Sequence, residues 1–133
     1  MTVPVVRVKD GSVKFLMGPA GGFRILAAIY GVAFYLGRDV TISCGADSHP
    51  AADHHMTGEA YDIRTADMDD ETIKRALLWL RQDLGPLFTV LHERPQDVDS
   101  GSPLSGLVTV NPNATGQHIH AQIKLGTVYP PVG

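Results

Sequence analysis

The chain has 133 residues, of which 44% are hydrophobic and 19% charged, with a formal net charge of −3. This length and balance predict one soluble globular domain, spanning residues 1–133. The small negative charge and the scattered Lys and Arg residues exclude the basic footprint of most nucleic-acid-binding proteins, so no nucleic acid partner is expected. The longest apolar stretch, residues 23–36, is too short to span a bilayer, so no membrane insertion is expected.

The first ten residues lack a charged segment followed by an apolar one, so no signal peptide is visible and a cytoplasmic location is expected for the chain as synthesised. The single cysteine, Cys44, cannot form an intrachain disulfide and is expected to be a small buried hydrophobe. No apolar stripe is left over once the core is assigned, which predicts a monomer.

The N-terminal part of the chain predicts strands around one helix. Residues 3–15 alternate around a turn signal, which is typical of a short hairpin. Residues 23–36 form an apolar run that ends at Gly37, which predicts a mostly buried helix. Residues 39–44 are rich in β-branched side chains and predict a strand that enters a loop over residues 45–53.

The C-terminal part predicts a second helix between strands. Residues 69–84 begin with an acidic turn and continue with apolar positions three and four residues apart, which predicts an amphipathic helix that stops at Gly85. Residues 87–91 predict a buried strand, residues 94–105 a polar surface loop, and residues 116–125 an alternating strand. The expected fold class is therefore α+β, with a small antiparallel sheet and two main helices.

Five of the six histidines fall in two short windows, residues 49–55 and 118–120. Clustering of this kind suggests a metal site. In the second window the strand period of two puts His118 and His120 on one face, while Ile119 points oppositely into the core. The two imidazoles can then converge on one ion or one substrate.

The first window leads into a segment that can place a carboxylate beside an ion. If the chain is extended here, Gly58, Ala60 and Asp62 share one face. The two small residues leave room for an ion, and the missing side chain of Gly58 allows His55 to fold back over that face. Two histidines and one carboxylate leave the fourth position of a tetrahedral zinc open, as in catalytic sites. A set of two histidines and one carboxylate therefore predicts a hydrolytic Zn²⁺ site.

The two windows together follow the pattern His55-x-x-Gly58-x-Ala60-x-Asp62, then His118-x-His120. This pattern resembles the zinc D-Ala-D-Ala metallopeptidases, relatives of lysostaphin-type peptidases and of the hedgehog domain. The resemblance implies a hedgehog-like or DD-peptidase-like fold and zinc ligands at His55, Asp62 and His120. It also implies that His118 lies near the scissile group as a transition-state stabiliser or proton donor. Enzymes of this group cleave peptide bonds in bacterial cell-wall peptides, usually next to a D-amino acid.

Three positions depart from the pattern of that family. Asp53 stands where the family often has Ser, and Gln117 stands where several members have a Glu that serves as general base. Because an amide takes no proton at neutral pH, the base is unassigned, and His118 is preferred over Glu93 and Asp53. Gly45-Ala46-Asp47 replaces a Gly-Tyr-Arg turn whose Arg commonly engages a substrate carboxylate, which favours an endopeptidase over a carboxypeptidase.

The first hypothesis is therefore a zinc metallopeptidase that hydrolyses bacterial peptidoglycan peptides, in the style of a phage endolysin that reaches the cell wall after release through a holin. A D-Ala-D-Ala carboxypeptidase is the nearest alternative. A zinc-stabilised binding or structural module without turnover is an alternative of another class, and Gln117 keeps it open.

For other residues the simpler structural interpretation is preferred. His92 and Glu93 follow an apolar strand, where solvated strand-end side chains are the default, and the alternative for Glu93 is a base or a partner near the metal. Tyr61 and Trp79 are expected to pack in or beside the core. The remaining histidines of the first window are expected to be solvated loop residues.

Overall fold

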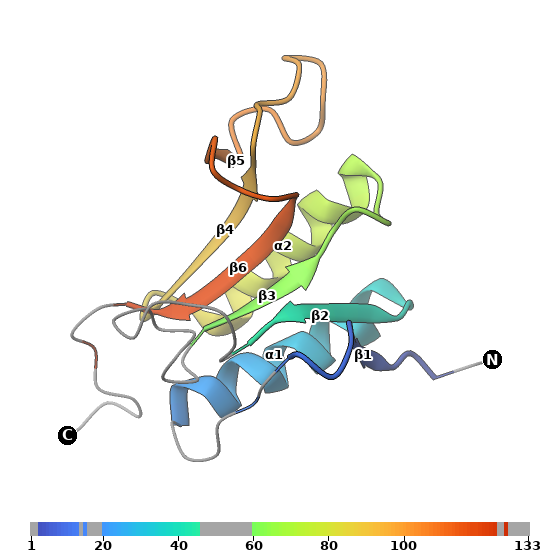
Figure 1. The fold of residues 1–133 in the computed structure, drawn as a ribbon, viewed down its shortest axis with the longest axis vertical. Coiled ribbons are helices and arrows are strands. Elements are labelled where there is room, and N and C mark those ends of the chain that lie inside the picture. The colour runs from blue at the N-terminus through green and yellow to red at the C-terminus, as the bar shows by residue number, and fades with distance from the viewer. Residues whose placement is uncertain (1–2, 14, 16–19, 46–59, 125–126, 128–133) are drawn as a thin grey trace.

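The computed structural model describes residues 3–13, 15, 20–45, 60–124 and 127. Six strands form one sheet in the order β1-β2-β3-β6-β4-β5, and two helices pack together against one face of it (Figure 1). In chain order the elements are β1 (Val6–Val8), α1 (Ala20–Leu36), β2 (Val40–Cys44), β3 (Ala60–Arg64), α2 (Asp70–Leu84), β4 (Phe88–Arg94), β5 (Val108–Val110) and β6 (His118–Ile123). Neither described helix is long and apolar enough to cross a membrane.

The sheet is mixed, so the prediction of two helices in an α+β fold is confirmed but the prediction of an antiparallel sheet is wrong. β1 runs parallel to β2 and β4 runs parallel to β5, whereas β2–β3, β3–β6 and β6–β4 are antiparallel. The predicted hairpin over residues 3–15 is also wrong, because Val6 pairs with Val40 of β2. Parallel strands need a long crossover, and α1 provides it between β1 and β2.

Helix α1 ends where the sequence predicts. Gly37 has a φ of 67°, and its amide donates to the Ala33 carbonyl at 2.9 Å, which closes the helix with a glycine in the left-handed region. The helix begins three residues earlier than expected, at Ala20. Its outer face leaves Phe23, Tyr30 and Phe34 exposed, so the expectation that the core accounts for the whole apolar pattern is wrong.

Helix α2 stops at Gly85 as predicted, and Asp69, expected in its first turn, is instead its N-cap. The Asp69 carboxylate accepts from the Thr72 amide at 2.8 Å, and Gly85, with a φ of 78°, donates its amide to Arg81. The Arg81 guanidinium in turn donates to the Val90 carbonyl at 2.9 Å. These contacts fix the position of α2 along β4, which is one of the strands that carry the candidate site.

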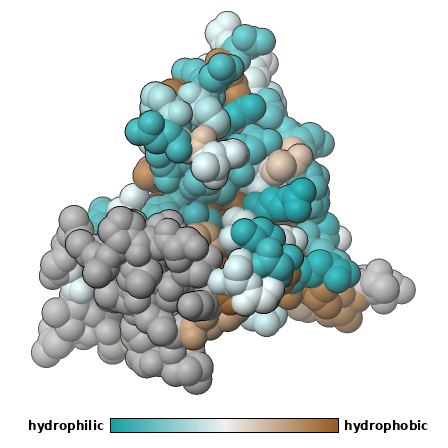
Figure 2. Space-filling view, in the orientation of Figure 1, coloured by the Kyte–Doolittle hydropathy of each residue, from teal (hydrophilic) through white to brown (hydrophobic). Residues whose placement is uncertain are grey.

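The core lies between the helices and one face of the sheet. Strand β6 alternates between partly buried and fully buried residues, as predicted, and Ile119, Ala121 and Ile123 face the helices. Tyr61 is fully buried and Trp79 packs against the core, so the packing interpretation of both is confirmed. Figure 2 shows the opposite side, where described hydrophilic side chains cover the region of β4 and β5 and hydrophobic ones gather near β1.

Candidate metal centre

The three central strands present a grid of side chains on the face away from the helices. The antiparallel register of β3, β6 and β4 brings residues from all three strands opposite one another, and paired side chains of such strands lie about 5 Å apart. The three rows are Arg64–His118–Glu93, Asp62–His120–Leu91 and Ala60–Gln122–Thr89. Two of these rows contain all the titratable side chains of the grid.

Asp62 and His120 form a direct contact across β3 and β6. The Asp62 Oδ1 atom lies 2.9 Å from His120 Nδ1, and the Gln122 Oε1 atom lies 2.6 Å from His120 Nε2. Because both ring nitrogens face an acceptor oxygen, this arrangement suits the doubly protonated ring. Burial works against the charged ring, but the Asp62 carboxylate and the Gln122 amide outweigh it and raise the pKa of His120 above its ordinary value.

His118 lies between two carboxylates. Its Nε2 atom is 3.5 Å from Glu93 Oε1 and 3.8 Å from Asp62 Oδ2. The imidazole side chain is 23% exposed, whereas the carboxylates of Asp62 and Glu93 are 10% and 18% exposed. The imidazole therefore faces one carboxylate from each of its two neighbouring strands.

A neighbouring loop orients the Glu93 carboxylate. The Asn111 Nδ2 atom donates to Glu93 Oε2 at 3.1 Å, and Asn111 Oδ1 accepts from the Asn113 amide at 3.1 Å. Because the amide oxygen already accepts a backbone hydrogen bond, the NH₂ group has to face Glu93. The backbone amide of Asn111 is itself anchored to the Arg94 carbonyl at 2.8 Å.

The structure brings together four of the residues singled out in the sequence: Asp62, His118, His120 and Glu93. The third expected ligand, His55, lies outside the described residues, as do Asp53 and the histidines at positions 49 and 54. Asp62 and His120 offer the carboxylate oxygen and imidazole nitrogen that zinc prefers, side by side. Across the described ranges no group of three or more His, Cys, Asp or Glu side chains is arranged to hold a metal, so a complete zinc site needs a further ligand such as His55.

The expectation that His92 is a solvated strand-end residue is wrong. Strand β4 continues to Arg94, and His92 pairs with Ile119 on the core face, where it is fully buried. Burial, with the Arg94 charge nearby, lowers the pKa of His92 to about 4, so the ring is neutral at physiological pH. Glu93 points the other way and contacts His118 and Asn111 instead of being merely solvated.

Cys44 lies beside the candidate centre and is only partly buried, so the expectation of a buried hydrophobe is wrong. The register of β2 and β3 shifts between Ile42 and Cys44, and the shift sets Cys44 opposite Asp62. A bulge of this kind re-aims side chains at a strand end. Nothing in the sequence marks the position of the bulge.

Sequence reasoning also missed Arg64, Asn111 and Gln122. The strand period of two could have placed Gln122 with His120 and Arg64 with Asp62. No local signal could have placed Asn111, because it follows a three-residue strand whose partner lies in another part of the chain.

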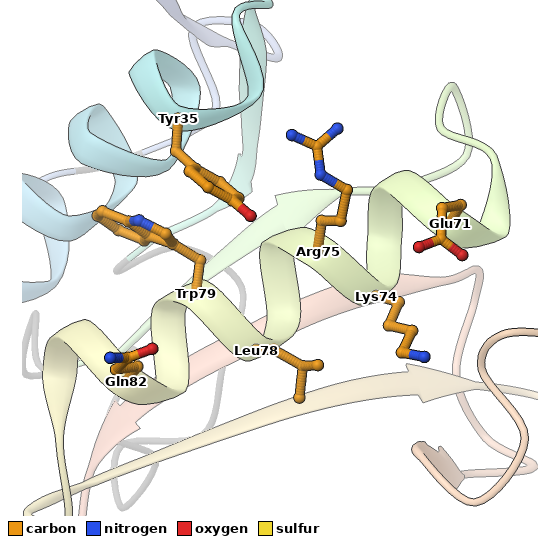
Figure 3. A pocket seen from close by; sticks show the side chains of 7 residues that line it. All are labelled: Tyr35, Glu71, Lys74, Arg75, Leu78, Trp79 and Gln82. Carbon is orange, nitrogen blue, oxygen red and sulfur yellow. The ribbon is translucent and has the colours of Figure 1, made fainter.

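A groove elsewhere on the described surface runs along α2 (Figure 3). Side chains from both helices line it: Tyr35, Glu71, Lys74, Arg75, Leu78, Trp79 and Gln82. The rings of Tyr35 and Trp79 stack with centroids 5.9 Å apart, and the Arg75 guanidinium lies 5.1 Å from the Tyr35 centroid. These aromatic faces are therefore used in packing the helices together, and we assign no ligand to the groove.

Comparisons of this chain with protein-family models, with curated proteins and with solved structures found no match.

Proposed function

We propose that this chain is a zinc-dependent peptidase that hydrolyses peptide bonds in bacterial peptidoglycan. The observation that carries the proposal is the contact between Asp62 and His120, at 2.9 Å on paired strands, beside the His118–Glu93 pair at 3.5 Å. Two of the proposed metal ligands and the proposed proton-carrying groups thus lie on one face of the sheet. The histidine and carboxylate pattern of the sequence, which resembles the zinc D-Ala-D-Ala metallopeptidases, supports the same assignment.

The residues that would hold Zn²⁺ are His55, Asp62 and His120. When bound, the metal supplies a polarised substrate carbonyl and a water of lowered pKa. The Gln122 amide oxygen, 2.6 Å from His120 Nε2, accepts the proton of that nitrogen. This hydrogen bond keeps the proton on Nε2. The Nδ1 atom of His120, which faces Asp62, is then the nitrogen that would lose its proton and bind the metal.

Glu93 and His118 would carry the protons of the reaction. The Glu93 carboxylate is the general base, since the amide of Gln117 cannot take a proton. His118, between Glu93 and Asp62, stabilises the negative charge that develops on the carbonyl oxygen and donates a proton to the leaving amine. Asn111 holds one oxygen of Glu93, which directs the other toward His118.

The test is zinc-dependent release of new amino termini from purified peptidoglycan, with fragments identified by mass. We expect His120→Ala to lose both bound zinc and release. His118→Ala and Glu93→Gln should keep their zinc and lose release by at least about 100-fold, the usual contribution of a general acid or base. Lys74→Ala, on the outer side of α2, is the control and should behave like the native chain.

A folded, zinc-loaded chain that releases nothing from walls of several bacterial types would contradict the proposal and favour a zinc-stabilised binding module. Release by a chain without bound zinc would contradict the metal assignment. The masses of the fragments distinguish an endopeptidase from a D-Ala-D-Ala carboxypeptidase.

A further inference from the structure

Arg64 is the last residue of β3 and belongs to the same grid as the candidate centre. It pairs with His118 in the register of β3 and β6, and it shares its face with Asp62 two residues earlier. Its side chain is exposed. The Arg64 side chain therefore leaves the sheet next to His118, from the strand on the side opposite to Glu93.

The other arginines all use their guanidinium groups within the fold. Four form ion pairs, one covers an aromatic ring and one donates to a carbonyl: Arg7–Asp39, Arg24–Asp83, Arg38–Asp67, Arg94–Asp70, Arg75–Tyr35 and Arg81–Val90. Within the part of the chain that the structure describes, the Arg64 side chain forms no ion pair and no hydrogen bond, although its backbone pairs with His118 of β6. This guanidinium differs from the others in being available to a ligand.

The two carboxylates nearest to Arg64 in the grid contact other residues. Glu93 lies two strands away, about 10 Å at the usual strand spacing, and contacts His118 and Asn111. The Asp62 carboxylate contacts both histidines of β6. In the chain without bound zinc, an anionic peptide that approaches these two carboxylates is repelled, unless a cationic side chain on the same face offsets their charge.

We infer that Arg64 binds a carboxylate of the substrate peptide, which makes it a specificity-determining residue. The inference rests on the proposed function and deepens it, because it names the substrate class as acidic peptides with a carboxylate near the scissile bond. A guanidinium binds a carboxylate through two parallel hydrogen bonds and thereby fixes its orientation. In a wall peptide the carboxylate can be the C-terminus or the α-carboxylate of an internal D-glutamate.

The probe is a synthetic pentapeptide of alanine, D-glutamate, lysine and two D-alanines. It is prepared with both carboxylates free, with an amidated C-terminus, or with an amidated D-glutamate. Binding to the metal-free chain, where no turnover is expected, is followed through the Nε–Hε resonance of Arg64. Cleavage by the zinc-loaded chain gives kcat and KM for each peptide.

We expect the fully acidic peptide to shift the Arg64 resonance. One of the two amidated peptides should not shift it, and the carboxylate missing from that peptide is the one that Arg64 binds. Arg64→Gln should raise the dissociation constant and KM for the acidic peptide about tenfold, the lower range for a charged hydrogen bond. The same substitution should leave both constants unchanged for the amidated peptide that does not shift the resonance. Arg64→Lys should restore part of the loss. Arg7→Gln removes the same charge on β1 and should change nothing.

Two outcomes separate this inference from the proposed function. If the native chain cleaves the peptides but Arg64→Gln retains its preference for the acidic form, the inference is overturned and the proposed function stands. If no peptide is cleaved but the carboxylate preference in binding disappears with Arg64→Gln, the proposed function fails and the carboxylate site stands. Equal loss of binding for acidic and amidated peptides in Arg64→Gln indicates a structural role and overturns the inference.

Discussion

Gln122 contacts the ring nitrogen of His120 that faces away from Asp62, at 2.6 Å. A hydrogen bond of this kind fixes both the tautomer and the orientation of a metal-binding imidazole. We predict that Gln122→Leu lowers the zinc affinity about tenfold, the smaller effect seen for such partners, as measured by competition with a chromophoric chelator. Gln122→Glu keeps an acceptor and should bind zinc at least as well as the native chain.

Gln82→Leu, on the outer side of α2, makes the same chemical change away from the centre and should leave the zinc affinity unchanged. Equal affinities of Gln122→Leu and the native chain would show that the contact of Gln122 with His120 is unimportant for the metal.

Asn111 contacts the Glu93 carboxylate and not the proposed metal ligands. We predict that Asn111→Ala lowers kcat about tenfold, because a base with both oxygens free to rotate is less often aligned, while the zinc affinity stays the same. Steady-state cleavage and chelator competition measure the two quantities. Asn113→Ala is the matched control, since Asn113 contacts Asn111 through its backbone amide, which the substitution retains.

At the scale of elements, the two helices meet through Gly31 and Trp79. A Cβ atom at Gly31 would lie 2.5 Å from the Trp79 ring, and that ring is held against Tyr35. We predict that Gly31→Ala destabilises the fold by about 1 kcal/mol, because overpacking of about 1–3 kcal/mol exceeds the gain of up to about 1 kcal/mol in helix propensity. Urea unfolding of the variant measures the change.

A double-mutant cycle with Trp79→Leu tests the cause. With the ring removed, the Gly31→Ala substitution should become neutral or stabilising. The same cost in both backgrounds would mean that the contact with Trp79 does not limit the size of residue 31.

The elements that the sequence predicted correctly are those whose signals are local. Apolar periodicity and end glycines define both helices, and β-branched or alternating runs define β2 and β6. Strand β5, in contrast, follows the predicted polar loop of residues 94–105 and is only three residues long. The parallel pairing of β1 with β2 and of β4 with β5 depends on contacts between distant segments, which no local pattern encodes.

The same distinction holds for the candidate centre. The period of two placed His118 and His120 on one face of β6, because that relation lies within one strand. The positions of Glu93 and Arg64 beside His118 depend on the register between strands. His92 was misjudged for a related reason, since the strand extends past it and turns its ring toward the core.

At the scale of the whole molecule, buried His92 links folding stability to pH. Its pKa is about 4 in the folded chain against 6.5 for an unperturbed histidine, so the unfolded chain binds this proton more readily between these values. The free energy of unfolding therefore carries no penalty from His92 above pH 6.5. It falls as the pH is lowered from 6.5 to 4, by about 3 kcal/mol at most.

We predict that His92→Leu, which fits an apolar site, flattens this pH dependence. Urea unfolding of both chains at pH 7 and pH 4.5 measures it, and the difference between the chains removes the effect of the carboxylates that they share. Parallel loss of stability in both chains on acidification would contradict the assignment to His92.

Strand β6 supplies the core and the candidate centre with alternate residues of one six-residue segment. Insertion or deletion of a single residue within it would exchange the two sets, turning the imidazoles toward the helices and the isoleucines toward solvent. The alternation of β6 therefore sets both the core residues and the residues of the candidate centre, and neither set can shift without the other. Relatives that differ in length should carry their extra or missing residues in the connecting segments, and variation inside β6 should be restricted to one-for-one replacement.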